Sequence, residues 1–133
     1  MTLTGSPAGL HERLPARAQS IGGLRHAVVE FARASGASAD QLATIALAVS
    51  EALSNTVLHA YVGCDEPGVV IVDAHVRERS LEVLVRDEGH GMRPRTDSPG
   101  LGLGLPLIAR LTERLVISEA TPGTSVRMCF AIG

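Results

Sequence analysis

A long helix that is apolar on more than one side is the feature that most constrains how this chain folds. Ser38, followed by Gln41 three residues later, matches a capping box, so we expect a helix from about Ala39 to about Ala60. Residues at helical spacing form its main apolar face: Leu42, Ile45, Ala46, Val49, Leu53 and Ala60. Apolar residues continue onto the other side at Leu47, Ala48 and Leu58. Such a helix is predicted to be buried on more than one side.

Three polar residues interrupt this apolar surface at a spacing of four. Glu51, Asn55 and His59 are offset by ~40° each, so they lie one above another, opposite the main apolar face. The ordinary interpretation is that they are solvated or are satisfied core groups. Burying an unpaired carboxylate costs several kcal/mol, however, so a cavity for a cation, water or ligand is more economical. There Glu51 is a candidate base and Asn55 a candidate hard-metal ligand, whereas His59 either lines the pocket or is a hydrogen-bonded structural residue.

The rest of the pattern predicts an α+β domain, because strands and helices do not alternate strictly. An edge strand is expected over 10–17, where Pro15 argues against a central position. Ser20 is the expected cap of a helix that runs to about Ala34. The other expected elements are strands over 68–77 and 81–86, a glycine-rich loop over 87–105, a short helix, and a closing hairpin of 115–120 and 124–131.

Length and composition exclude several classes of protein. The chain has 133 residues, 45% hydrophobic and 20% charged, so we expect a single domain over 10–133 after a flexible N-terminus over 1–9. A net charge of -2 and 2% aromatic residues argue against direct nucleic-acid binding. All 12 basic residues are arginine, which excludes a phosphate-binding-loop lysine and a Schiff base.

No sequence feature predicts export or a membrane span. Cys64 and Cys129 are isolated, so neither a disulfide framework nor a thiolate metal site is expected. The N-terminal residues lack the apolar segment of a signal peptide, and no apolar run approaches the ~20 residues needed to span a bilayer. We therefore expect a cytoplasmic protein without a membrane partner.

Two glycine-rich segments offer backbone groups to a ligand. Asp87, Gly89 and Gly91 follow a strand directly, so the backbone can approach a ligand closely and Asp87 can accept a hydrogen bond from an amino group. An ordinary turn is the alternative. The run from Gly100 to Pro106 precedes a helix, and free N–H groups at such a position attract phosphate. This run is not a dinucleotide fingerprint, because leucine stands where the third glycine is required and no strand directly precedes it.

Four motifs occur in a fixed order along the chain. They are Glu51-x-x-x-Asn55, Asp87-x-Gly89-x-Gly91, Gly102-x-Gly104 and Gly123-Thr124. This order resembles the nucleotide-binding boxes of the GHKL ATPase superfamily, the histidine-kinase-like ATPases. The stretch AVSEALSNTVLHAY at 48–61, together with VRDEGHGM and GLGLGLPLI, is similar to the bacterial anti-sigma-factor serine/threonine kinases. The resemblance covers residues 10–131.

The resemblance implies a fold, a reaction and a set of site residues. The fold is a Bergerat-type two-layer sandwich, in which helices back a mixed β-sheet. ATP and Mg²⁺ bind between helix and loops, with Asn55 as the Mg²⁺ ligand, Glu51 as the general base and Asp87 reading the adenine amino group. The other candidate nucleotide contacts are His59, Gly89, Gly91, Met92, Arg95, Gly102, Leu103, Gly104, Leu105 and Thr124.

The resemblance leaves two functions open. The first is an anti-sigma kinase, a homodimer that binds a sigma factor and phosphorylates Ser or Thr of a STAS-domain anti-anti-sigma protein. The second is a non-catalytic, nucleotide-gated module that binds a sigma factor or another partner. Glu51 favours the kinase. The segment between Gly91 and Gly102 favours the module, because it is shorter than in many such kinases, although Arg93 or Arg95 within it is a candidate γ-phosphate ligand.

Overall fold

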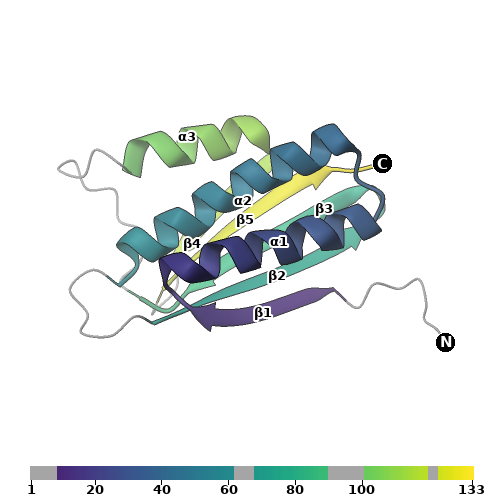
Figure 1. Ribbon diagram of the computed structural model, residues 1–133. Coiled ribbons are helices and arrows are strands. Elements are labelled where there is room, and N and C mark those ends of the chain that lie inside the picture. Colours follow the sequence, from purple (N-terminus) through teal and green to yellow (C-terminus); the bar gives the residue numbers. More distant parts are fainter. Residues whose placement is uncertain (1–8, 62–67, 90–100, 120–122) are drawn as a thin grey trace.

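Three helices and five strands make up the computed structural model, which describes residues 9–61, 68–89, 101–119 and 123–133 (Figure 1). In chain order they are β1 (Leu10–Pro15), α1 (Ala18–Ala34), α2 (Ala39–His59), β2 (Val69–Arg77), β3 (Ser80–Asp87), α3 (Leu101–Leu111), β4 (Arg114–Glu119) and β5 (Thr124–Ala131). The helices lie on one side of the sheet (Figure 1). The predicted α+β class and two-layer arrangement are confirmed. Of the predicted N-terminal segment, only Gly9 is among the described residues.

The sheet has the strand order β1-β2-β3-β5-β4, and all its pairings are antiparallel. β1 is an edge strand, as Pro15 predicts. The antiparallel pairing corrects the mixed sheet that the resemblance implied. β3 and β4 do point in the same direction, but β5 lies between them, so these two strands form no parallel pair.

The core lies between the sheet and the helices. Leu81, Val83 and Val85 of β3 are buried and alternate with more exposed residues, and β5 repeats this period-two pattern. Every helix contributes fully buried side chains, among them Leu24, Val28, Ile45, Val49, Leu53 and Ile108. Burial of an aliphatic side chain contributes ~1.5–3 kcal/mol. This shared core therefore fixes α2 over the strands that carry the polar residues considered below.

α2 is the central helix, because it contacts α1, α3 and the sheet. The predicted capping box is confirmed: the Ser38 hydroxyl accepts from the Gln41 N–H at 3.2 Å, and the Gln41 side-chain oxygen accepts from the Ser38 N–H at 2.8 Å. One side of α2 remains exposed, since Leu47 is 46% exposed and Leu58 is 64% exposed. These two leucines do not extend the buried surface as predicted, because a helix in a two-layer sandwich keeps one side open to solvent.

The apolar character of α2 also meets the length and composition expected of a membrane-crossing helix, with a mean hydropathy of 1.2. This finding corrects the expectation that no apolar run approaches that length. In the structure 44% of the most apolar 18-residue stretch of this helix is buried inside the protein. Its buried residues, among them Ile45, Val49 and Leu53, belong to the hydrophobic core. The core therefore accounts for the apolar character of this helix.

α1 begins earlier than predicted. Its N-cap is Arg17, which makes no side-chain capping bond, and the Ser20 N–H donates to the Arg17 carbonyl at 2.9 Å within the first turn. The prediction that Ser20 caps this helix is therefore wrong. The reason is the position of the edge strand: the Ala16 N–H donates to the Gly68 carbonyl at 2.9 Å, so the chain turns into α1 directly after β1.

α3 also begins earlier than predicted, inside the segment expected to be a loop as far as Leu105. The helix starts at Leu101, so Pro106 lies within it rather than in its first turn. Ile108 is fully buried, and Leu105 and Leu111 pack against the core at a spacing of three. We attribute the longer helix to this apolar stripe, whose packing outweighs the low helix propensity of glycine.

Candidate functional site

Several elements bring the predicted polar residues to one end of the sandwich. α2 ends and α3 begins at the left of Figure 1, where β5 also begins. Asp87 is the last residue of β3 and pairs in register with Thr124, the first residue of β5. α2 packs on both strands and carries Asn55 near its C-terminal end. Residues that are far apart in the sequence are thus brought to one end of the fold.

Three of these side chains are buried although they are polar. Asn55 and Asp87 are each 5% exposed and Thr124 is 2% exposed. Together with Thr56 they are the buried polar or charged residues within the described ranges. Burying a polar group costs free energy unless the group is hydrogen-bonded. The partners of each side chain therefore indicate what the site is suited to bind.

Asp87 is fixed by backbone donors on either side. One carboxylate oxygen, Oδ1, accepts from the Gly89 N–H at 3.0 Å, and the backbone N–H of Thr124 also donates to this carboxyl group. Burial raises the pKa of Asp87 above its ordinary value, and the two hydrogen bonds partly oppose that rise. A carboxylate held in this way presents a fixed hydrogen-bond acceptor to the N–H group of a ligand.

Two glycines allow the backbone to close around Asp87. Gly123 has a φ of 109°, and a Cβ there would lie 1.9 Å from the Asp87 carbonyl oxygen. A Cβ on Gly89 would lie 2.0 Å from the Ala60 carbonyl oxygen. Gly89 therefore lies close to the residue that follows α2, and its approach to a ligand stays a prediction. Neither position has room for a side chain without movement of the backbone.

The raised pKa of Asp87 predicts a pH-dependent stability difference between the parent protein and Asp87→Asn. Because the pKa is higher in the folded than in the unfolded chain, the stabilising contribution of Asp87 is present at low pH and is lost as the pH rises through the folded-state value. An amide does not titrate, so Asp87→Asn should gain stability relative to the parent between about pH 3 and pH 7. Denaturant unfolding of both nucleotide-free proteins across this range measures the difference. A difference that is constant, or that changes in the opposite direction, would contradict the assignment.

Asn55 carries the clearest sign of a missing polar partner. Its side-chain nitrogen Nδ2 is buried and makes no hydrogen bond to any described residue. Leaving a buried donor unpaired costs ~1–3 kcal/mol. A side-chain amide offers one oxygen, which can bind Mg²⁺, and one nitrogen, which can donate to a phosphate oxygen. Asn55 is therefore suited to a phosphate-bearing ligand with its metal ion.

The donor set fits a metal ion that arrives with a nucleotide. Within the described ranges, no group of three or more His, Cys, Asp and Glu side chains is arranged to hold a metal ion. Mg²⁺ in nucleotide sites is bound by one or two protein oxygens, by water and by the phosphates of the substrate. Asn55 can supply one such oxygen. The described residues thus fit Mg²⁺ bound to ATP.

Glu51 and His59 lie one helical turn on either side of Asn55. All three are on α2, as predicted, and their spacing of four places them along one side of the helix. Glu51 and His59 are partly exposed, whereas Asn55 between them is buried. The carboxylate of Glu51 can therefore meet a group that enters from solvent. The roles of both flanking residues stay predictions.

The remaining predicted nucleotide contacts lie between Gly91 and Leu105. Gly91, Met92 and Arg95 lie outside the described residues. The backbone of Gly102, Leu103 and Gly104 is helical, and Leu105 packs against the core. The first N–H groups of any α-helix lack intrahelical partners, so the start of α3 keeps the donors on which the phosphate prediction rests. These nucleotide contacts stay predictions.

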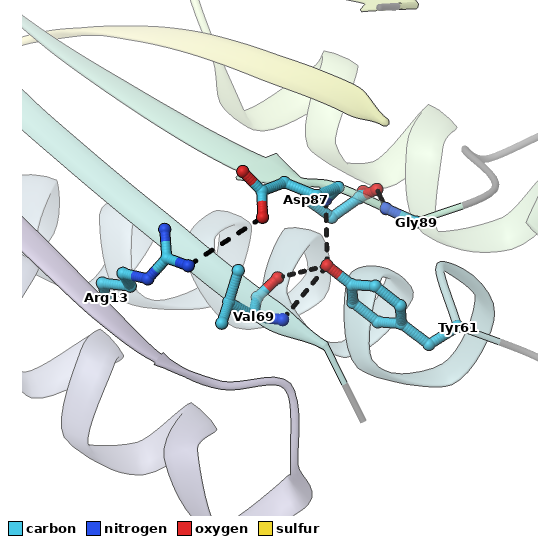
Figure 2. A network of polar contacts seen from close by, with 6 residues as sticks. Arg13, Tyr61, Val69, Asp87 and Gly89 are labelled. Carbon is cyan, nitrogen blue, oxygen red and sulfur yellow. Dashed lines mark hydrogen bonds and ion pairs between the residues drawn. The ribbon is translucent and has the colours of Figure 1, made fainter. Parts of the chain in front are cut away.

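Sequence reasoning missed Tyr61, which follows α2 and contacts two other segments. Its hydroxyl accepts from the Glu88 N–H at 2.9 Å, next to Asp87 (Figure 2). The same hydroxyl donates to the Val69 carbonyl at 2.6 Å. One signal pointed to this residue: it is the chain's single tyrosine, two positions after the polar series that ends at His59.

Comparisons with known proteins agree with this arrangement. Residues 14–130 match the family described as the histidine kinase-like ATPase domain. Serine-protein kinase RsbW of Halalkalibacterium halodurans is 30% identical over 128 residues, which cover 85% of this chain and 77% of that protein. An anti-sigma F factor of Clostridium perfringens is 31% identical over 125 residues, which cover 85% of this chain and 89% of that protein.

Two solved structures share the fold. The RsbU and RsbW domains of Rv1364c from Mycobacterium tuberculosis match with a TM-score of 0.76 at 23% identity, over 95% of this chain and 33% of that one. The histidine kinase domain of the blue-light activated histidine kinase EL346 from Erythrobacter litoralis matches with a TM-score of 0.62 at 24% identity, over 90% of this chain and 62% of that one. The sequence relatives and the family match extend this likeness beyond the fold. The chain therefore belongs to the histidine kinase-like ATPase family and, within it, to the bacterial anti-sigma-factor kinases.

Proposed function

We propose that the chain is an ATP-binding anti-sigma regulator that phosphorylates Ser or Thr of a STAS-domain anti-anti-sigma partner. The observation that carries this proposal is the buried polar group of Asn55, Asp87 and Thr124, at the end of the sandwich where α3 begins. Relatives named serine-protein kinase and anti-sigma F factor support the choice of a serine kinase reaction and of a sigma factor as one partner. In the reaction the γ-phosphoryl group moves from ATP to the hydroxyl oxygen, and the hydroxyl proton leaves to a base.

Each site residue has a distinct role in this proposal. Asp87 accepts a hydrogen bond from the adenine amino group, and Thr124 closes the pocket beside it. Asn55 holds the Mg²⁺ ion that accompanies ATP, and this ion offsets the negative charge of the phosphates. The N–H groups in the first turn of α3, over 102–104, donate to phosphate oxygens, whereas Leu105 lies far enough into the helix for its N–H to have an intrahelical partner. Glu51, one turn before Asn55, takes the proton from the substrate hydroxyl.

The proposal extends to the partners and the compartment. A sigma factor is the protein that the chain would hold inactive, and the chain itself would act as a cytoplasmic homodimer. Light scattering tests the oligomeric state, because a dimer has twice the 13.9 kDa mass of one chain. Pull-down with each sigma factor of the source genome, with and without ATP, tests the inhibitory partner.

A second candidate is a nucleotide-gated binding module without phosphoryl transfer. The sequence observation that favours it is the short segment between Gly91 and Gly102, which contains Pro94 and Pro99. A segment this short has fewer residues that could supply the groups that complete a kinase site. Such a module would bind ATP and a partner but would leave the γ-phosphate in place.

The experiment that tests the proposed function is phosphoryl transfer from labelled ATP. The full chain is incubated with Mg²⁺, ATP labelled at the γ-phosphate and each STAS-domain protein of the source genome. Label on Ser or Thr of one STAS protein is the expected result. Nucleotide binding without label transfer to any of these proteins would reject the kinase and support the binding module.

Asn55→Ala is predicted to weaken ATP binding in the presence of Mg²⁺ by about ten-fold, or ~1.4 kcal/mol. Binding of ADP without metal should change less, because only the metal-dependent contact is lost. Stability should not fall, since the variant also removes a buried donor that has no partner among the described residues. Calorimetric titrations with Mg²⁺ and with a chelator measure both affinities. If Mg²⁺ does not affect ATP affinity in the parent, the metal role of Asn55 is wrong.

A further inference from the structure

The hydroxyl group of Tyr61 uses its full hydrogen-bonding capacity. It donates to the Val69 carbonyl at 2.6 Å and accepts from the Val69 N–H at 3.1 Å and the Glu88 N–H at 2.9 Å. A tyrosine hydroxyl has one hydrogen to donate and two lone pairs to accept with. Figure 2 shows the hydroxyl at the meeting point of these contacts. One oxygen thus joins the residues after α2, the first residue of β2 and the residue after β3.

The ring of Tyr61 is enclosed by two glycines. A Cβ on Gly68 would lie 2.1 Å from the ring atom Cε1, and a Cβ on Gly89 would lie 3.0 Å from Cδ1. The ring also packs against the hydrophobic core. A side chain at Gly68 would therefore displace the ring, and one at Gly89 would crowd it. This enclosure sets the position from which the hydroxyl makes its hydrogen bonds.

The Glu88 amide, which donates to the Tyr61 hydroxyl, lies between Asp87 and the residue whose N–H holds the Asp87 carboxylate. Asp87 precedes it, and the Gly89 N–H that follows donates to Oδ1 of Asp87 at 3.0 Å. The side chain of Glu88 adds little to this support, because it lies 4.0 Å from Arg13 in an exposed ion pair. Tyr61 therefore connects the helix that carries Asn55 to the strand end that carries Asp87.

We propose that Tyr61 is a positioning residue that sets the base selectivity of the nucleotide site. Its hydroxyl holds the backbone beside Asp87, so that the carboxylate faces the adenine amino group before ATP arrives. This inference rests on the proposed function, because it takes Asp87 as the residue that reads adenine. It assigns Tyr61 no contact with the phosphates or with Mg²⁺, which belong to Asn55 and the start of α3.

Tyr61→Phe removes the hydroxyl and keeps the ring between the glycines. The Glu88 N–H and both polar groups of Val69 lose their shared partner, so part of the nucleotide-binding energy is spent on reordering this segment. We expect the affinities for ATP and ADP to fall by the same factor, about ten-fold or more, because both carry adenine. GTP affinity should fall less, so the ratio of ATP to GTP affinity decreases. The factor by which Mg²⁺ strengthens ATP binding should not change.

Calorimetric titrations of the full chain with ATP, ADP and GTP, each with Mg²⁺ and with a chelator, test this inference. Ser38→Ala is the matched control, because it removes the capping box at the other end of α2 and lowers stability without touching the site. The control should keep parent affinities and selectivity. Parent-like binding by Tyr61→Phe, or an equal loss in both variants, would overturn the positioning role. A loss of Mg²⁺ dependence with selectivity intact would also overturn it.

Hydrogen exchange in the parent protein gives a second measurement that does not depend on how Tyr61→Phe folds. The Glu88 amide follows the last residue of β3, and its hydrogen bond to Tyr61 should slow its exchange. Rapid exchange of this amide would contradict the inference.

Failure of the proposed function gives a different result. The parent protein then binds no nucleotide, or it binds ATP and GTP equally, and the role of Asp87 in reading the base is excluded. If the parent prefers ATP to GTP and Tyr61→Phe keeps the same preference, only the role of Tyr61 is excluded.

Discussion

Glu51→Gln should lose phosphoryl transfer to the STAS partner while keeping ATP affinity. A serine hydroxyl is a poor nucleophile at neutral pH, so transfer benefits from a carboxylate positioned to take its proton. General-base assistance is worth ~10²–10⁴ in rate, about 3–5 kcal/mol of barrier. Glutamine keeps the shape of the side chain and removes the base. Nucleotide binding should persist, because Asn55 and the start of α3 hold the phosphates in the proposed site.

The location of Glu51 supports a role in transfer rather than in folding. It lies one turn before Asn55 on α2 and is partly exposed, so its carboxylate is accessible to a hydroxyl brought by a partner. Single-turnover transfer from labelled ATP measures the rate, and calorimetry measures the affinity. Glu30→Gln, an exposed change on α1, is the matched control. Equal rates for the parent and Glu51→Gln would exclude Glu51 as the base.

A third outcome separates the two candidate functions. If neither the parent nor Glu51→Gln transfers phosphate to any STAS protein, yet both bind ATP and a sigma factor, the nucleotide-gated module is the function. Glu51 would then be an ordinary, partly exposed polar residue of α2 rather than the base. Retention of ATP affinity in the variant is needed for this conclusion, since a variant that no longer binds ATP cannot report on the chemical step.

The sequence predicted elements whose signals are local. Ser38 and Gln41 lie within one turn of each other, so their capping box predicted the start of α2 correctly. The alternation of Leu81, Val83 and Val85 with polar residues likewise predicted β3, because period-two burial follows from strand geometry. Asp87 could be placed at a strand end for the same reason. These features depend on neighbours in the chain and need no knowledge of the tertiary fold.

The errors and omissions arise where tertiary contacts decide. The start of α1 depends on the hydrogen bond between Ala16 and Gly68, which joins segments about fifty residues apart. The antiparallel order follows from the insertion of β5 beside β3, which no local pattern reveals. Tyr61 has one partner eight residues away and another twenty-seven residues away. Its importance to the site becomes visible only when the ends of α2 and β3 are brought together.

The Asp87 side chain should decide which base the site accepts. In the proposed site the buried carboxylate accepts a hydrogen bond from the adenine amino group, which guanine lacks at the corresponding position. Asp87→Asn weakens the acceptor and places an amide donor where adenine also donates. A hydrogen bond to a charged group is worth ~1.5–3 kcal/mol, so ATP affinity should fall by about ten- to a hundred-fold. GTP affinity should change much less, because its oxygen can accept from the new amide.

Calorimetry with ATP and GTP, in the presence of Mg²⁺, measures this change of selectivity. Glu88→Gln is the matched control, because it alters the next carboxylate in the chain, which is exposed and lies 4.0 Å from Arg13. That control should bind both nucleotides as the parent does. Burial raises the pKa of Asp87, so the Asn variant should gain stability relative to the parent as the pH rises. Denaturant unfolding of the variant at the assay pH shows whether a loss of ATP binding reflects unfolding. Equal affinities of the parent for ATP and GTP would show that Asp87 does not read the base.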